Sequence, residues 1–149
     1  MPSNSFEPLR RYNKLLVETD AVYHTFSKKF GYSDGEMTVM YALCSIGDRV
    51  PLSKLCAWSG LSKQTIHSAV RKLERGGVLY LEPSDGKRKL VCLTEHRKVV
   101  AASTAGRVMQ FENEVFDAWE SSDVEQYLLL TERFAAALRE KANSFEREL

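Results

Sequence analysis

The sequence has little of what secreted or membrane-bound proteins need. Its 149 residues include only three cysteines, Cys44, Cys56 and Cys92, which lie far apart. An odd and scattered set argues against a disulfide framework and is typical of a reducing compartment, so we expect a cytoplasmic protein. No apolar run approaches the roughly 18 residues that a membrane span needs, and residues 1–4 show no basic segment followed by an apolar one. We therefore expect neither a membrane span nor a secretion signal.

Catalytic and metal-binding patterns are also missing from the sequence. It contains no nucleophile elbow, no phosphate-binding loop, no His-Glu-x-x-His and no clustered pair of acids. The histidines, His24, His67 and His96, are far apart, and no two have the spacing of metal ligands on one helix. We therefore expect no enzyme activity, no metal and no cofactor.

What the sequence does have is an uneven distribution of charge, although its net charge is only +1. Residues 1–49 are neutral, residues 50–100 carry a net +6, and residues 101–149 carry a net −5. A basic middle beside an acidic flank indicates a segment that binds a polyanion. The alternative is a solvated charged surface whose asymmetry arose by chance.

The N-terminal part of the chain predicts two helices. In residues 6–30, apolar and aromatic residues recur every three or four positions, and Gly31 follows as a C-terminal cap. The next helix should begin after Ser33, which has capping-box spacing to Glu36, and should end near Gly47.

The C-terminal part predicts one long helix over residues 95–119 and a last helix that begins with a second capping box, Ser122 and Glu125. The apolar stripes of these helices and of residues 6–30 are too long for the short middle of the chain to cover. We therefore expect them to bury against a second copy of the chain, in a homodimer. The alternative is a bundle within one chain.

The middle of the chain predicts two short helices joined by a tight turn at Gly60. The first covers about residues 52–58, and Ser62 caps the second, which ends at Arg75. One face of the second helix is apolar, with Ile66, Ala69, Val70 and Leu73. A helix-turn-helix of this kind places its second helix in the major groove of DNA.

The other face of that helix is polar and basic, as a recognition helix requires. Gln64 could pair with adenine through two hydrogen bonds, Lys63 could reach guanine, and Arg71 suits the phosphate backbone. The alternative is an ordinary amphipathic helix with a solvated basic face. The candidate DNA contacts on this helix are Ser62, Lys63, Gln64, Thr65, His67, Ser68 and Arg71.

Two β-prone runs follow, over residues 78–82 and 89–93, and the Pro and Asp-Gly between them favour the turn of a hairpin. Lys87, Arg88 and Lys89 at this turn repel one another and have no structural task. Insertion into a minor groove, whose negative potential attracts such side chains, would explain them.

The order and spacing of these segments resemble the MarR family of winged helix-turn-helix transcriptional regulators. LSKLCAWSGLSKQTIHSAVRKLERGGVL is similar to the helix-turn-helix of the family, and DGKRKLVCLTE is similar to its wing and the entry to its next helix. The resemblance implies a mainly α fold with a small β-hairpin wing. It also implies a single domain of residues 1–149, with dimerisation helices in 1–31 and 100–149 and a DNA-binding lobe in 33–98.

The resemblance further implies a homodimer that binds a pseudo-palindromic operator in double-stranded DNA and usually represses transcription. Asp85 matches the wing aspartate of the family. Lys87 stands where the family most often has the wing arginine, and a lysine lacks the planar fork of an arginine. Either Lys87 or Arg88 is therefore the candidate for the minor groove. A winged-helix module that binds another protein, with no DNA-binding function, is the alternative.

Members of this family often respond to small phenolic or lipophilic molecules where the dimerisation and DNA-binding lobes meet. Packing in the core is the simpler explanation for the residues that could line such an effector site here. We expect all three thiols among apolar neighbours, and no cysteine precedes Cys44 to match the peroxide-sensing position of some relatives. The candidate effector-binding residues are Tyr23, His24, Phe26, Met40, Tyr41 and Cys44.

Overall fold

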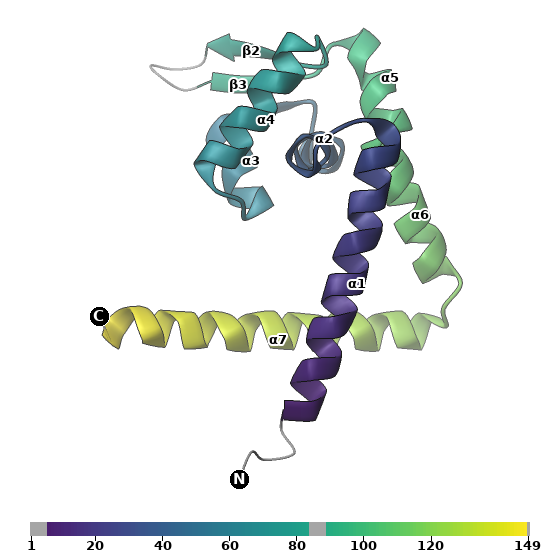
Figure 1. The fold of residues 1–149 in the computed structure, drawn as a ribbon, viewed down its shortest axis with the longest axis vertical. Coiled ribbons are helices and arrows are strands. Elements are labelled where there is room, and N and C mark those ends of the chain that lie inside the picture. Colours follow the sequence, from purple (N-terminus) through teal and green to yellow (C-terminus); the bar gives the residue numbers. More distant parts are fainter. Residues whose placement is uncertain (1–5, 84–88, 149) are drawn as a thin grey trace. The chain divides into compact units, whose positions relative to one another are not determined.

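The structure is a computed structural model that describes residues 6–83 and 89–148. The chain divides into two compact units, Met1–Met109 and Gln110–Leu149. The described residues are mainly helical with one small sheet, which confirms the predicted fold class (Figure 1). In the described part of the chain, no helix combines the length and the apolar character that crossing a membrane demands.

The elements follow one another in the order that the sequence predicts, with one additional strand and one additional helix. The first unit holds α1 (Phe6–Phe30), α2 (Asp34–Ile46), β1 (Arg49–Pro51), α3 (Leu52–Ser59), α4 (Lys63–Arg75), β2 (Tyr80–Pro83), β3 (Lys89–Cys92) and α5 (Glu95–Ser103). α6 (Ala105–Asp117) begins in the first unit and ends in the second, which also holds α7 (Ser121–Glu148).

α2 is the central helix of the first unit, where it contacts α1, α3, α4, α5 and β1 (Figure 1). It begins with the predicted capping box: Glu36 N–H donates to Ser33 Oγ, and Ser33 N–H donates to Glu36 Oε1, both at 3.1 Å. Its apolar side chains form the middle of a core to which all the other helices of the unit and the sheet contribute. The buried core includes Met37, Val39, Met40, Leu43, Val50, Leu55, Ile66, Leu73, Leu79, Val91, Ala101 and Val108.

The sheet is antiparallel, with the strand order β1-β3-β2. β2 and β3 are the two arms of the predicted hairpin. β1 is the additional strand, and it pairs with β3 through Val50 opposite Val91. Both of these valines are buried, so one face of the sheet packs on the core. β1 runs directly into α3. The sheet that contains the hairpin is therefore connected to the helix-turn-helix through β1.

The single helix predicted over residues 95–119 is wrong. The chain forms α5 and α6, which are separated at Thr104, where the backbone leaves helical geometry at φ −115° and ψ −89°. The Thr104 hydroxyl donates to the Val100 carbonyl at 2.8 Å, and such bonds compete with the helical backbone for acceptors. Thr104 is also buried, with its hydroxyl 3.7 Å from Met40 Sδ on α2. A contact between distant parts of the chain thus accompanies a break that the local periodicity does not show.

The last helix begins two residues earlier than the predicted cap at Ser122 implies. α7 begins at Ser121, and the Asp123 N–H donates to the Glu120 carbonyl at 3.0 Å. Glu120 therefore stands at the cap position. The predicted capping box of Ser122 and Glu125 is wrong, because Ser122 already lies inside the first turn.

Aromatic side chains join the end of α6 to α7 in the second unit. The Phe116 and Trp119 rings meet edge to face with centroids 5.5 Å apart, and Trp119 meets Tyr127 of α7 in the same way at 5.5 Å. Edge-to-face pairs of this kind stabilise the corner between two helices.

Candidate nucleic-acid interface

The turn before α4 is fixed by short local contacts. Gly60 has φ +67°, in the left-handed region that a residue without Cβ adopts easily. Ser59 Oγ accepts the Leu61 N–H at 3.1 Å, and Ser62 Oγ accepts the Thr65 N–H at 3.1 Å. Ser62 is therefore the N-cap of α4, as the sequence predicts. These contacts set the point from which the polar face of α4 begins.

α4 has two chemically distinct faces. Ile66, Ala69, Val70 and Leu73 are its buried residues, which confirms the predicted apolar stripe. The opposite face carries most of the predicted DNA contacts. Ser62, Lys63, Gln64, Thr65, Ser68 and Arg71 are exposed, and His67 is half-buried at the edge of this face.

Two hollows lie along the exposed face of α4. The first has a volume of about 280 Å³ and is lined by Gln64, Ser68, Arg71 and Arg75. The second, of about 410 Å³, lies between this face and the N-terminal end of α2. It is lined by Ser33, Gly35, Gln64, Thr65, Ser68, Ala69 and Lys72. Gln64 and Ser68 border both hollows and so lie at the centre of the exposed face.

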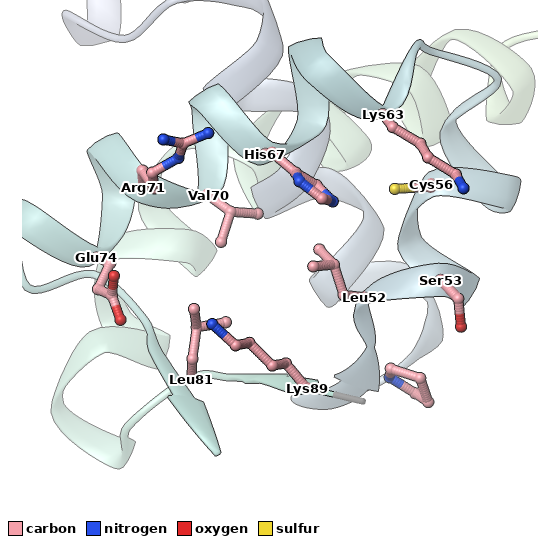
Figure 2. Close-up of a pocket in the computed structure, with 11 residues that line it drawn as sticks. Leu52, Ser53, Cys56, Lys63, His67, Val70, Arg71, Glu74, Leu81 and Lys89 are labelled. Carbon is pink, nitrogen blue, oxygen red and sulfur yellow. The ribbon is translucent and has the colours of Figure 1, made fainter. Parts of the chain in front are cut away.

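A larger cleft, of about 700 Å³, separates α4 from α3 and the hairpin. His67 and Val70 project from α4 toward Leu52 of α3 and Leu81 of β2 (Figure 2). The lining of this cleft contains more cationic than acidic side chains. The cations are Lys63 and Arg71 of α4 and Lys89 of β3, and the acid is Glu74. The cleft thus extends from the basic face of α4 to the base of the hairpin.

The structure brings the helical candidates together but does not describe the hairpin tip. Asp85, Lys87 and Arg88 lie outside the described residues. Ser62 Oγ also lies 2.8 Å from Thr65 Oγ1, so both hydroxyls already have a partner within the chain. Lys63, Gln64, Ser68 and Arg71 have the exposure that a contact with DNA requires. The role of every helical candidate stays a prediction.

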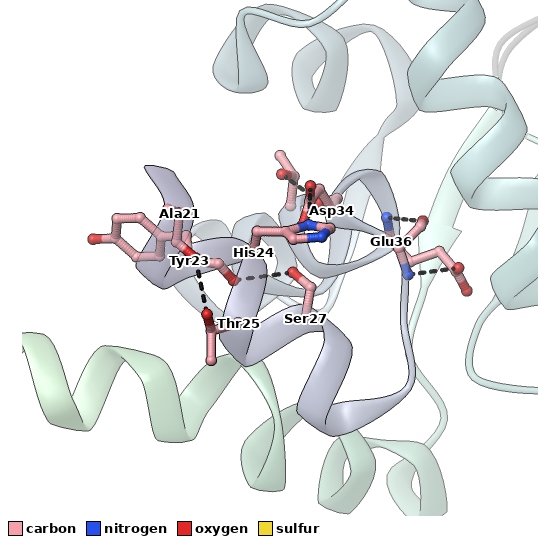
Figure 3. A network of polar contacts seen from close by, with 9 residues as sticks. Ala21, Tyr23, His24, Thr25, Ser27, Asp34 and Glu36 are labelled. Carbon is pink, nitrogen blue, oxygen red and sulfur yellow. Dashed lines mark hydrogen bonds and ion pairs between the residues drawn. The ribbon is translucent and has the colours of Figure 1, made fainter. Parts of the chain in front are cut away.

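The six candidate effector residues lie on α1 and α2 and have various neighbours. His24 Nδ1 lies 3.0 Å from Asp34 Oδ2 (Figure 3), and the Tyr41 ring is 6.0 Å from that of Trp58. Met40 is buried in the core, as the packing alternative expects. Tyr23 is exposed and meets the half-buried Phe26 edge to face, with centroids 6.5 Å apart. The effector site over these residues stays a prediction.

The cysteines differ in their surroundings. Cys92 is buried, Cys56 is half-buried and lines the cleft beside α4, and Cys44 is exposed. The Cys44 thiol nevertheless donates to the Ala101 carbonyl of α5 at 3.8 Å, and burial raises its pKa. The expectation that all three thiols lie among apolar neighbours stays a prediction. Within the described ranges, no three His, Cys, Asp or Glu side chains lie close enough together to hold a metal ion.

Two features of this region were missed by the sequence interpretation. Glu74 lines the cleft, although its place on the helix gave no reason to single it out. Arg49 of β1 forms an ion pair with Glu82 of β2. No local sequence pattern links Arg49 to Glu82, because their proximity depends on the pairing of β1 with the sheet.

Sequence comparison finds no matching family model. It also finds no matching curated protein. Solved structures do match. A MarR family regulator from Neisseria meningitidis is 18% identical, with a TM-score of 0.76 over 95% of this chain and 98% of that one. AbsC, a MarR family regulator from Streptomyces coelicolor, is 17% identical, with a TM-score of 0.76 over 93% of this chain and 97% of that one. S. aureus MepR, solved as a complex with DNA, is 15% identical, with a TM-score of 0.71 over 87% of this chain and 96% of that one.

The helix-turn-helix and the attached three-stranded sheet define this chain as a winged helix-turn-helix protein. Its fold is the one found in MarR-family transcriptional regulators. In this chain, helices flank the winged helix-turn-helix on both sides in the sequence. The resemblance that the sequence motifs indicate is thereby confirmed for the fold.

Proposed function

We propose that this chain is a cytoplasmic transcriptional regulator that binds a pseudo-palindromic operator in double-stranded DNA as a homodimer and acts as a repressor. The observation that carries the proposal is the division of α4. Its apolar face is fixed in the core, whereas its opposite face presents Lys63, Gln64, Ser68 and Arg71 to solvent beside the hairpin. Side chains of this kind on a rigid helix suit the edges and backbone of the major groove.

The roles of the residues follow from their chemistry and their place on α4. Lys63 and Gln64 lie in its first turn, the part of a recognition helix that contacts base edges. Arg71 lies two turns further along and suits the phosphate backbone. We also propose that Lys87 or Arg88, in the turn of the hairpin, enters the adjacent minor groove. S. aureus MepR has the same fold and was solved with DNA, which favours this arrangement.

The exposed apolar surface of the terminal helices supports the homodimer. α7 has no buried residue, although its apolar side chains recur at helical spacing. A soluble helix with such a stripe needs a partner to cover it. On α1, Leu9 and Leu16 are 48% and 44% exposed, so the predicted stripe of this helix is open as well. We propose residues 1–31 and 100–149 as the dimerisation helices. The apolar residues of α7 that are 42–60% exposed are Tyr127, Leu128, Leu129, Leu130, Phe134, Leu138 and Phe145.

Release from DNA by a small aromatic or lipophilic effector is a further part of the proposal. Its support is the family resemblance, together with the candidate residues on α1 and α2. Titration of the protein–DNA complex with small phenols tests it, and release of labelled duplex is the expected result.

Selection of bound duplexes from random DNA tests the main proposal. We expect two inverted half-sites whose centres lie roughly 10 bp, or a multiple of that, apart. Gln64→Ala should then reduce discrimination at one base position of each half-site by about 1–3 kcal/mol. Lys63→Ala should do the same at a second position, whereas Arg71→Ala should weaken all sequences alike. If no duplex binds even at low salt, the alternative of a protein-binding winged-helix module is favoured.

A further inference from the structure

An ion pair crosses the full width of the sheet. Arg49 lies on β1 and Glu82 on β2, and β3 runs between these two strands. The Arg49 guanidinium reaches over β3 to the Glu82 carboxylate, which also accepts a hydrogen bond from the Tyr80 hydroxyl at 3.3 Å. We call Arg49, Glu82 and Tyr80 the sheet clamp.

The sheet clamp closes over the Cys92 thiol. Cys92 of β3 is paired with Arg49 on one side and with Tyr80 on the other, and directly paired residues present their side chains on the same face. Cys92 is 0% exposed, although Arg49 and Tyr80 are exposed. Burial raises the pKa of the Cys92 thiol and the nearby Glu82 carboxylate raises it further, whereas the Arg49 guanidinium lowers it. The thiol therefore reports on whether the clamp is closed.

The two ends of the clamp belong to different parts of the proposed DNA interface. Arg49 begins β1, which continues without a gap into α3 and the helix-turn-helix. Glu82 belongs to β2, the arm of the hairpin that leads to residues 84–88. The opposite face of the sheet rests on the core through Val50 and Val91. The clamp thus ties the hairpin to the helix-turn-helix on the side away from the core.

We propose that Arg49 is a positioning residue for DNA binding, because its ion pair with Glu82 holds the hairpin at a fixed angle to α4. This inference rests on the proposed function. Two contact elements that are held in one geometry lose less conformational entropy on binding than two elements that move independently. Arg49 also neutralises a carboxylate on the hairpin, whose charge would otherwise oppose the approach of a polyanion.

Thiol reactivity tests the clamp without DNA. In a Cys44→Ser/Cys56→Ser background, Cys92 is the thiol that remains. Arg49→Met should raise its rate of reaction with a maleimide about two- to fivefold, the range expected for loss of a surface ion pair. Loss of the guanidinium removes an interaction that lowers the thiol pKa, so this increase would report exposure of the thiol. Glu82→Gln should raise the rate as well, through exposure and through a lower thiol pKa together. The swap Arg49→Glu/Glu82→Arg should return the rate toward that of the background protein. Arg147→Met is the matched control, because Arg147 pairs with Glu140 within α7 and with no described residue of the sheet. Unchanged rates in both single variants would overturn the clamp.

DNA binding tests the positioning role. Arg49→Met should weaken binding about two- to fivefold, and the swap should restore it. The decisive measurement is a double-mutant cycle with Lys87→Ala/Arg88→Ala. If Arg49 acts by positioning the hairpin, its substitution should cost little once the hairpin cations are gone, whereas its effect should add to that of Gln64→Ala. Simple addition in both cycles would refute positioning while leaving the proposed function standing. Absence of any DNA binding by the unsubstituted protein would overturn both.

Discussion

Arg71→Ala is the substitution that probes the electrostatic part of the proposed interface most directly. Arg71 is exposed on α4 and borders both the large cleft toward the hairpin and the hollow beside Gln64. If α4 enters the major groove as proposed, we expect the backbone of the duplex to pass within reach of this side chain. Because it sits on the face opposite the core, we expect the variant to fold normally.

The expected magnitude follows from the number of phosphate contacts that are lost. Each neutralised phosphate contributes about 0.9 to the slope of log affinity against log salt concentration. A homodimer presents Arg71 twice, so the slope should become less steep by about 1.8. Over a fourfold increase in salt, from about 50 to about 200 mM, the unsubstituted protein should lose about twelvefold more affinity than the variant does.

Fluorescence anisotropy with a labelled duplex measures this slope. The titration is done at several salt concentrations, with a selected operator and with a scrambled duplex. We expect the same change in slope on both, because a phosphate contact carries no sequence information. Lys98→Met, which removes a paired surface cation outside α4, should leave the slope unchanged. A slope that does not change in Arg71→Ala, or a loss confined to the operator, would refute the backbone role.

Three further predictions concern the framework that holds the interface. Ile66→Ala removes a side chain on the core-facing side of α4 that is 0% exposed. The variant should lower the free energy of unfolding in urea by about 2–5 kcal/mol. A loss near zero would contradict the assignment of Ile66 to the core. Gly77 has φ +72°, and an added Cβ would lie 2.9 Å from Arg97 Nη2, so Gly77→Ala should cost about 1–2 kcal/mol. Because the backbone strain remains, Gly77→Ala/Arg97→Ala should recover only part of that loss in the same urea titration. Hydrogen bonds from Ser27 and then His24 hold the pKa of the Asp34 carboxyl below its usual range. The ionised carboxylate therefore stabilises the fold at neutral pH. That contribution is lost as the pH falls through the lowered pKa. Ser27→Ala should raise the Asp34 pKa in an NMR titration, and an unchanged value would exclude Ser27 as the main cause.

The parts of the site that the sequence predicted well depend on neighbours in the chain. The apolar stripe of α4, the Ser62 cap and the capping box of Ser33 and Glu36 all involve residues within a few positions of one another. For such features, the spacing of residue types is already the physical cause of the structure. The same local cues identified the hairpin, because a turn sequence lies between two β-prone runs.

The wrong predictions have equally specific causes. Periodicity alone predicted one helix over residues 95–119, because an apolar stripe continues through Thr104. The hydroxyl of Thr104 bonds to the preceding turn and contacts Met40, which lies 64 positions earlier. The capping box assigned to Ser122 and Glu125 had the right spacing, but the helix begins at Ser121. Spacing shows that a cap is sterically available and does not show where the chain first turns.

The sequence by itself determined the class of this protein: the order of the helices, the two faces of α4 and the concentration of positive charge in the middle of the chain. Only the tertiary structure decided how the hairpin is attached. Arg49 and Glu82 are 33 positions apart and meet because β1 and β2 pair with opposite edges of β3. The physical reason is that helices and caps arise from interactions between near neighbours, whereas strand pairing and the contacts that depend on it require the whole chain to be folded.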